Sequence, residues 1–237
     1  MKKAIVTGAS SGIGEAAAAA LIEAGYEVYG IGRNYNKECG LLEQPSFYPH
    51  VCDLKKHADV QREIASIKEE AGSISVLVNC AGVGYFGPHE QINPDKLHEM
   101  VAVNVEAPMI IAGMLLRDMK KNGGTIINIS SVTAKKSNTY GCAYGATKAA
   151  LTSFGGSLFD EARKYGVRVT TICPDMTKTE LYRNADFREA EEEEARLVPE
   201  DVADAVAFVL NAREGMVLSE LTLKPQLHRI RKKPLAK

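Results

Sequence analysis

Short runs of apolar residues rich in Val and Ile alternate along the chain with longer segments of helical periodicity. The apolar runs have the length of strands and lie at 3–7, 27–32, 47–51, from 74 onward, 124–130, 166–172 and 216–223. The helical patterns lie at 12–25, 55–71, 94–120, 144–164 and 199–210. Strands that are apolar throughout are typical of a parallel sheet covered on both faces. The pattern predicts an α/β fold with about seven parallel strands and helices on both faces.

No internal repeat, proline-rich linker or low-complexity segment divides the 237 residues, so residues 1–237 are expected to form a single domain. The formal net charge of −1 gives no support to nucleic-acid binding. The five cysteines are odd in number and have no C-x-x-C spacing, which favours reduced thiols. No run approaches 18 apolar residues and no secretory signal is visible, so we expect a soluble, cytoplasmic protein without a membrane partner.

A glycine-rich turn follows the first expected strand and opens the first expected helix. The sequence TGASSGIG at 7–14 places Gly8, Gly12 and Gly14 in the spacing G-x-x-x-G-x-G. Small residues let the backbone approach a pyrophosphate, and the helix N-terminus supplies N–H donors and a positive dipole. A glycine-rich connection without a ligand is the alternative, but the position after the first strand of an α/β pattern favours a dinucleotide site.

The end of the second strand bears on the choice between the two nicotinamide cofactors. An acidic residue there would bind the ribose 2′-hydroxyl of NAD and repel a 2′-phosphate. This chain has Gly32 at that place and Arg33 next to it. Arginine binds phosphate through two parallel hydrogen bonds, so NADP(H) is favoured over NAD(H). The alternative is that Arg33 is solvated and selects neither.

The stretch YGCAYGATKAA at 140–150 places Tyr140, Tyr144 and Lys148 four residues apart, on one face of a helix. A phenol can protonate the alkoxide that forms when a ketone accepts hydride, and a nearby lysine cation lowers the phenol pKa. Only Tyr144 has a lysine one turn ahead. Ser130 and Ser131, at the end of the fifth strand, could polarise a carbonyl oxygen.

Five motifs in order resemble the short-chain dehydrogenase/reductase family: TGASSGIG, NCAG at 79–82, VNV at 103–105, ISSV at 129–132 and YGATK at 144–148. The resemblance covers essentially the whole chain and implies a single-domain, Rossmann-type doubly wound sheet. It implies that Tyr144 is the acid/base and that Lys148 binds the nicotinamide ribose and lowers the tyrosine pKa. It selects Ser131, thirteen residues before Tyr144, as the catalytic serine. Asn104 matches the asparagine that holds a water in the proton relay.

The resemblance also implies a set of cofactor contacts along the chain. Asp53 matches an acid that contacts the adenine, and NCAG matches the segment that lines the adenine ribose. The expected cofactor-binding residues are Gly8, Ser10, Ser11, Gly12, Ile13, Gly14, Arg33, Asp53, Leu54, Asn79, Ala81, Gly82, Tyr144, Lys148, Pro174, Thr177 and Thr179. Two residues depart from the family pattern: Cys80 replaces a usual asparagine, and Asp175 replaces a usual glycine beside the nicotinamide.

Residues 180–198 occupy the place of the family's mobile substrate lid, and a basic tail covers 228–237. Glu191 to Glu194 are expected to form a solvated helix face, and the tail a disordered or subunit-packing terminus. Lys135 and Lys136 could attract an acidic substrate, although exposed lysines are the plainer interpretation. The histidines lack ligand spacing, which predicts no metal. Candidate substrate contacts are Thr133, Tyr140, Tyr85 and Tyr182.

These features predict an NADP(H)-dependent oxidoreductase that interconverts a carbonyl and an alcohol, assembled as a homodimer or homotetramer as is typical of the family. The partner would be a small-molecule substrate, with no nucleic acid. Two alternatives stay open: a regulatory protein that senses the dinucleotide without turnover, and an NAD-dependent alcohol dehydrogenase of the same family.

Overall fold

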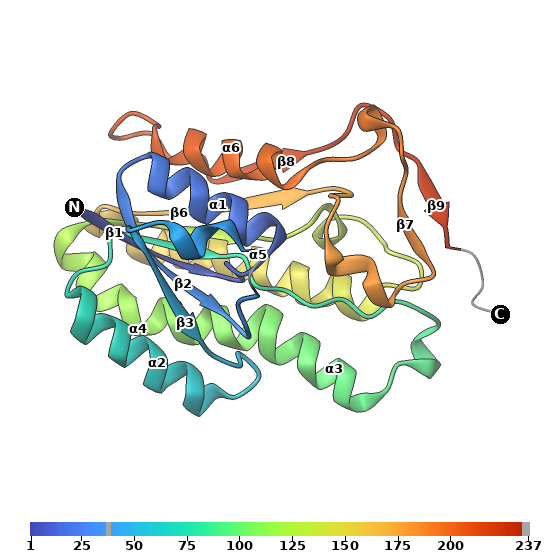
Figure 1. Ribbon diagram of the computed structural model, residues 1–237, viewed down its shortest axis with the longest axis horizontal. Coiled ribbons are helices and arrows are strands. Elements are labelled where there is room, and N and C mark those ends of the chain that lie inside the picture. The colour runs from blue at the N-terminus through green and yellow to red at the C-terminus, as the bar shows by residue number, and fades with distance from the viewer. Residues whose placement is uncertain (37–38, 234–237) are drawn as a thin grey trace.

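A parallel sheet forms the centre of the molecule in the computed structural model, which describes residues 1–36 and 39–233 (Figure 1). Its strands are arranged in the order β3-β2-β1-β4-β5-β6-β8. Their bounds are β1 Lys2–Thr7, β2 Tyr26–Gly32, β3 Phe47–Val51, β4 Val76–Asn79, β5 Gly124–Ile129, β6 Val167–Pro174 and β8 Glu220–Leu223. The seven strands match the predicted number. The last strand begins at Glu220 rather than at 216, because its pairing register with β6 begins with Thr171 opposite Glu220.

Helices cover both faces of the sheet, as the apolar strands require. α1 (Gly12–Glu23) and α6 (Pro199–Leu210) lie on one face, and α2 (His57–Ala71), α4 (Ala107–Asn122) and α5 (Cys142–Ala162) lie on the other (Figure 1). Each face has its own cluster of buried apolar side chains, with Leu21 and Val206 in one and Ile111 and Leu158 in the other. The doubly wound architecture expected from the sequence is therefore present.

The chain order reverses beside β1, and this reversal positions the candidate site. β2 and β3 lie on one side of β1, whereas β4 and the later strands lie on the other. In open α/β sheets ligands bind at such a switch point, outside the carboxyl ends of the strands. Here those ends are Thr7 of β1, Gly32 of β2 and Asn79 of β4.

The helix expected at 94–120 is continuous but not uniform. α3 (Pro94–Val101) passes into a π-helical turn (Ala102–Glu106) that leads directly into α4. The run Pro94–Asn122 is also long and apolar enough to meet a length-and-composition test for a membrane span, with a mean hydropathy of 1.5, contrary to the expectation that no segment comes near one. Half of the most apolar 18-residue stretch of this run is buried within the fold, and Ile111, Leu115 and Met119 pack in the core. The run is therefore a core helix in this structure.

A second, two-stranded sheet was not predicted. β7 (Phe187–Glu189), inside the expected lid, pairs antiparallel with β9 (Ile230–Lys232), in the expected tail. The expectation of disorder in the tail is therefore wrong for residues 230–232, and residues 234–237 lie outside the described residues. Short 3₁₀ turns complete the fold: Gly40–Glu43, His89–Gln91, Val132–Ala134, Arg163–Tyr165, Glu180–Asn184 and Glu193–Ala195.

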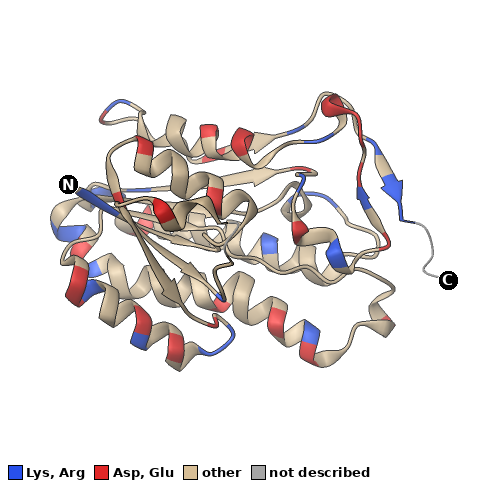
Figure 2. Ribbon diagram, in the orientation of Figure 1, with Lys and Arg blue, Asp and Glu red and all other residues tan. Residues whose placement is uncertain are grey.

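The acidic run of the lid also differs from expectation. Glu191 to Glu194 do not form a solvated helix face, because only Glu193–Ala195 makes a single 3₁₀ turn. Glu191 pairs with Arg231 and Glu192 lies 2.8 Å from Arg229. Figure 2 shows this acidic turn above β7, next to the basic strand β9. The acidic run is thus complementary to the basic tail.

Candidate active site

The glycine-rich turn is packed too closely for larger residues. Gly8 has a positive φ of 74°, and a Cβ there would lie 2.9 Å from the Cα of Ala81 at the end of β4. A Cβ on Gly14 would lie 2.2 Å from the carbonyl oxygen of Gly8. The Gly8 N–H donates to the Ile31 carbonyl at 2.7 Å, which joins the turn to β2. These contacts hold the turn against the ends of β2 and β4, at the switch point of the sheet.

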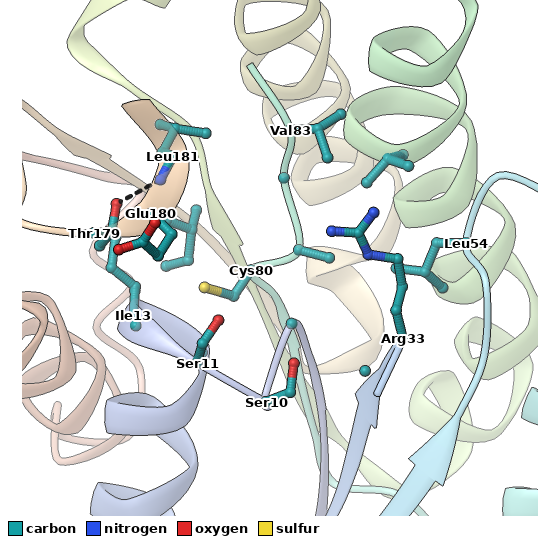
Figure 3. Close-up of a pocket in the computed structure, with 18 of the residues that line it drawn as sticks. Ser10, Ser11, Ile13, Arg33, Leu54, Cys80, Val83, Thr179, Glu180 and Leu181 are labelled. Carbon is teal, nitrogen blue, oxygen red and sulfur yellow. Dashed lines mark hydrogen bonds between the residues drawn. The ribbon is translucent and has the colours of Figure 1, made fainter. Parts of the chain in front are cut away.

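A cavity of about 470 Å³ opens in front of this turn. It runs between the ends of the strands and the first residues of the lid (Figure 3). Most expected cofactor contacts line it, namely Gly8, Ser10, Ser11, Gly12, Ile13, Gly14, Arg33, Asp53, Leu54, Ala81, Gly82, Tyr144, Lys148 and Thr179. The other three lie beside it: Asn79 donates to Asn128 at 2.9 Å, Pro174 ends β6, and Thr177 is buried.

The structure of the turn fits a dinucleotide. Ser11 is the N-cap of α1 but makes no side-chain capping bond, so the first N–H groups of the helix face the cavity. A Cβ on Gly12 (φ 57°) would approach Thr179 of the lid to 3.3 Å, and would fill the space between the turn and the lid. A ligand with a pyrophosphate matches this combination of N–H donors and missing side chains.

At the end of β2, steric crowding at position 32 disfavours an acidic residue. A Cβ on Gly32 would lie 2.9 Å from Ser10, so a larger residue could not stand there without displacing the glycine-rich turn. Arg33 extends over the cavity, with its guanidinium toward the segment after β4 (Figure 3). Its Nη1 lies 3.7 Å from Oε1 of Glu99 on α3, and the Tyr85 hydroxyl donates to Oε2 of Glu99 at 2.7 Å. Arg33 has 55% of its side chain exposed, and it faces a carboxylate that has only 16% of its side chain exposed.

Tyr144 and Lys148 are both buried on the inner side of α5. Lys148 donates from Nζ to the Ile129 carbonyl at 3.0 Å, and its Nζ lies 5.8 Å from the centre of the Tyr144 ring. Burial lowers the pKa of Lys148 to about 8. Burial also raises the pKa of Tyr144 above its ordinary value, and a hydrogen bond with Ser131 opposes that rise. The expected lowering of the phenol pKa is not present in the chain alone, because desolvation of the phenolate is the larger effect.

The structure separates the two candidate serines. The Ser130 hydroxyl donates to the Lys148 carbonyl at 3.0 Å and shares a hydrogen bond with Thr152 at 2.7 Å, so it is committed to α5. The Ser131 hydroxyl instead accepts from the backbone N–H and the hydroxyl of Thr133, at 3.2 and 3.0 Å, and lies beside the Tyr144 phenol. Ser131 thus lies beside the phenol and is oriented by Thr133, whereas Ser130 is the serine that lines the cavity.

Asn104 lies in the π-helical turn and is fully buried. Its Oδ1 accepts from the Val83 N–H at 2.9 Å, while its Nδ2 donates to the Val83 carbonyl at 2.9 Å and to the Thr147 hydroxyl at 3.0 Å. The side chain therefore joins the segment after β4 to α5, on the turn that carries Tyr144 and Lys148. Its observed contacts are those of a residue that positions the site.

Of the four expected substrate contacts, Thr133 and Tyr182 lie near Ser131 and Tyr144, whereas Tyr85 and Tyr140 do not. The rings of Phe86 and Tyr144 are 5.4 Å apart, and Tyr182 follows at 5.7 Å from Phe86. Tyr85 points instead to Glu99, near the Arg33 end of the cavity. Tyr140 has 61% of its surface exposed, with a positive φ of 60°, and it does not line the cavity in the part of the chain that the structure describes.

Some residues at the site were not expected from the sequence. In the sequence Glu99 is recognisable only as part of an expected helix. It lies one turn before Val103, so both side chains are on the helix face that lines the cavity. The Cys80 side chain points into the cavity beside Ser11 (Figure 3), and burial raises its thiol pKa to about 12, so it is inert as a nucleophile. Lys178, just before the lid, and Glu180, Arg183 and Glu189 of the lid also line the cavity, together with Leu181, which the sequence already suggested as a substrate contact.

Comparison with known proteins places this arrangement in a family. The model of the short chain dehydrogenases matches residues 2–190. An uncharacterised oxidoreductase of Staphylococcus epidermidis is 31% identical, over 94% of this chain and 97% of the relative. An alcohol dehydrogenase from the archaeon Thermococcus sibiricus, solved with 5-hydroxy-NADP, superposes with a TM-score of 0.85 at 28% identity, over 97% of this chain and 98% of that one. A 3-ketoacyl-(acyl-carrier-protein) reductase from Brucella melitensis, solved with NADH, has a TM-score of 0.83 at 25% identity, over 94% and 97%.

The similarity extends over nearly the full length of this chain and of each of these proteins, and the glycine-rich cavity lies within the matched region. Solved neighbours contain nicotinamide dinucleotides both with and without the 2′-phosphate. The chain belongs to the short chain dehydrogenase family and is an oxidoreductase with a site for a nicotinamide dinucleotide.

Proposed function

We propose that this protein is an NADP(H)-dependent oxidoreductase that interconverts a carbonyl compound and an alcohol. The observation that carries the proposal is the buried Tyr144–Lys148 pair, with Ser131 beside the phenol, at one end of a cavity whose other end holds Arg33. A proton donor, a cation and a carbonyl-polarising hydroxyl are what ketone reduction requires. A sensor without turnover has no use for them.

Each side chain has a distinct task in the reductive direction. The nicotinamide, when bound, supplies the hydride. The Ser131 hydroxyl donates a hydrogen bond to the carbonyl oxygen, where negative charge develops, and Tyr144 then gives that oxygen its proton. Lys148, with a pKa of about 8, is mostly protonated at neutral pH and stabilises the phenolate that remains. The buried site excludes water, which makes each of these electrostatic effects stronger.

The test of the mechanism is Tyr144→Phe, with Tyr140→Phe as the matched control on the exposed tyrosine of the same stretch. Tyr144→Phe should lower kcat by about a thousandfold or more, because general acid catalysis and the phenolate both disappear. NADPH binding, followed by its fluorescence, should be retained in both variants. An unchanged rate in Tyr144→Phe would refute the mechanism. If no carbonyl compound in a broad panel is reduced with either coenzyme, the result favours a sensor without turnover.

The preference for NADP(H) rests on Arg33 and on the absence of an acid at Gly32. Arg33→Ala should weaken NADPH binding by about tenfold or more and NADH binding much less, because only the former has a 2′-phosphate for the guanidinium. Arg213→Ala, on an exposed loop after α6, is the charge-matched control. Equal losses for both coenzymes would refute this assignment.

The position of Glu99 is an observation that favours NAD(H) over NADP(H). Its carboxylate faces the Arg33 guanidinium and would repel a 2′-phosphate held there. Under our proposal Glu99→Gln should tighten NADPH binding and leave NADH binding unchanged, while keeping an acceptor for Tyr85. If Glu99→Gln weakens NADH binding instead, Glu99 holds the ribose hydroxyl and the protein is an NAD-dependent member of the family.

We also propose a homodimer or homotetramer in the cytoplasm. Leu97, Val101 and Met109 are exposed apolar residues four to eight positions apart along α3 and α4, a stripe that a second copy could cover. Light scattering coupled to size exclusion tests the assembly, and a monomer at micromolar concentration would contradict it.

A further inference from the structure

Three aromatic side chains, Phe86, Tyr182 and Phe187, pack together over the catalytic phenol; we refer to them as the aromatic cluster. Phe86 lies 5.4 Å from the Tyr144 ring, 5.7 Å from Tyr182 and 5.3 Å from Phe187. Tyr182 and Phe187 are themselves 5.4 Å apart. Phe86 comes from the segment after β4, and the other two come from the lid. The lid therefore closes on the proton donor with ring-to-ring contacts.

Tyr144 lines the cavity and Phe86 packs on its ring, so a substrate at the Tyr144 hydroxyl would meet Phe86 first and, behind it, the two lid rings. Contacts between aromatic rings at such distances are favourable beyond the area they bury, so displacing them has a cost. An aromatic or branched apolar substituent restores equivalent contacts. A carboxylate would lose its hydration there and regain no hydrogen bonds from the rings.

Carboxylates beside the cluster add to this selection. Asp175, where the family usually has a glycine, has 11% of its side chain exposed; its Oδ1 accepts from the Met176 N–H at 2.9 Å, and its Oδ2 lies 3.8 Å from Lys136. Burial is the main cause that raises the pKa of the Tyr182 phenol, followed by Tyr144, Asp175 and Glu189. Glu189 lies two residues from Phe187 on β7 and lines the cavity.

Lys135 and Lys136 do not add an uncompensated positive charge beside Asp175. Lys135 pairs with Glu220, and Lys136, half exposed, faces Asp175. These two lysines are the ones that the sequence offers for an acidic substrate. Each has a carboxylate opposite it, so neither presents an uncompensated charge.

We infer that the substrate is a neutral carbonyl compound with an aromatic or branched apolar substituent, selected by Phe86, Tyr182 and Phe187 and protected from anionic competitors by Asp175. The inference rests on the proposed function and specifies its substrate class. The carbonyl carbon accepts a hydride from NADPH, which becomes NADP⁺, and the carbonyl oxygen takes a proton from Tyr144 that solvent later replaces. Asp175 is a specificity-determining residue in this scheme, not a catalytic one.

The experiment compares methyl benzoylformate with benzoylformate, which share one ring and one ketone and differ in charge. With NADPH, the wild-type kcat/KM should favour the ester by about a hundredfold. Asp175→Asn keeps the acceptor for Met176 and should raise kcat/KM for the carboxylate by about tenfold, while the ester changes by less than twofold; one charge across a few ångströms has an effect of this order. Because the ketones differ in intrinsic reactivity, the change in the ratio between variants is the informative quantity.

Three further variants make the result decisive. Lys136→Gln should widen the preference for the ester, since it removes the cation that offsets Asp175. Phe86→Ala should lower kcat/KM for the ester by about tenfold, and Asp204→Asn, on the exposed side of α6, should change neither substrate. A ratio that Asp175→Asn and Lys136→Gln both leave unchanged, or a wild-type preference for the carboxylate, overturns the inference and leaves the proposed function intact. Absence of turnover with every carbonyl and both coenzymes overturns the proposed function, and this inference with it.

Discussion

The two walls of the site are held in place by different kinds of contact. Around Tyr144 and Lys148 the contacts are buried hydrogen bonds: Asn104 joins Val83 to Thr147, and Ser130 joins β5 to α5. Such bonds are expensive to break, because each leaves an unsatisfied polar group away from water. This wall is part of the core, and its geometry is fixed before any ligand arrives.

The opposite wall is the lid, and it is held from outside by residues 227–233, which we name the C-terminal segment. Its backbone pairs with β7, and the Lys233 Nζ donates to the Tyr182 carbonyl at 2.6 Å. Arg229 and Arg231 pair with Glu192 and Glu191 in exposed ion pairs. Exposed ion pairs contribute little and weaken with salt. Under the proposed function, the proton donor therefore lies on the wall held by buried hydrogen bonds, and the lid is the wall held mainly by exposed ion pairs.

The strongest test of the rigid wall is Asn104→Ala. The substitution leaves the N–H and carbonyl of Val83 and the Thr147 hydroxyl without this partner, which should lower the free energy of unfolding by about 2–4 kcal/mol. Because the residue only positions other groups, kcat should fall at temperatures where the variant is still folded, with little change in the pH profile. Thermal denaturation and steady-state kinetics measure the two effects. Asn211→Ala, at the exposed end of α6, is the control, and a stable variant with full activity would show that the rigid wall does not depend on Asn104.

A second test uses the pKa of Lys148. In the folded state this pKa is about 8, below the value of 10.5 for a free lysine. At this lysine the unfolded chain therefore binds more protons between pH 8 and 10.5, so the contribution of Lys148 to stability should rise with pH across that window. Lys148→Met should remove this rise and be more stable than wild type at pH 7, by about 3 kcal/mol as an upper estimate. Denaturant unfolding at pH 7 and pH 10 checks it, and parallel curves for the two proteins would contradict it.

Loss of the contacts that hold the lid should have the smallest effect on activity and stability. Deleting residues 228–237 removes β9 and its ion pairs, and should raise KM by about fivefold through a more open lid, with the thermal midpoint little changed. Arg229→Glu alone should raise KM, because it places two carboxylates opposite each other. The double variant Arg229→Glu, Glu192→Arg should restore most of the wild-type KM, because the ion pair forms again with reversed charges. A tenfold fall in kcat without a change in KM would show that the segment supports the rigid wall instead.

Short-range patterns in the sequence predicted the strands and turns whose conformation depends on neighbouring residues. Apolar runs of strand length gave the seven strands, and the turn at Gly8 and the Tyr144–Lys148 spacing placed the cofactor end and the proton donor on one side of the sheet. The β7–β9 pair was missed because two three-residue strands more than 40 positions apart carry no periodic signal. Pairing of Arg33 with Glu99, and of the lid glutamates with the tail, also depends on contacts across long distances in the chain.

Electrostatics at the site could not be predicted for a related reason. The spacing of Tyr144 and Lys148 suggested that the cation lowers the phenol pKa, but the outcome depends on burial. With both groups removed from water, desolvation raises one pKa and lowers the other. Burial is a property of the packed fold and is not visible in a four-residue spacing.

The π-helical turn at Ala102–Glu106 has a consequence for how the chain could change over generations. A π turn is equivalent to one residue inserted into an α-helix, so α3 and α4 are offset from each other by a single position. Removing any one residue of the turn would restore an unbroken helix and rotate Asn104 away from Val83 without touching the sheet. A three-nucleotide deletion in this turn would thus change the placement of Asn104 while leaving the sequence of every strand of the sheet unchanged.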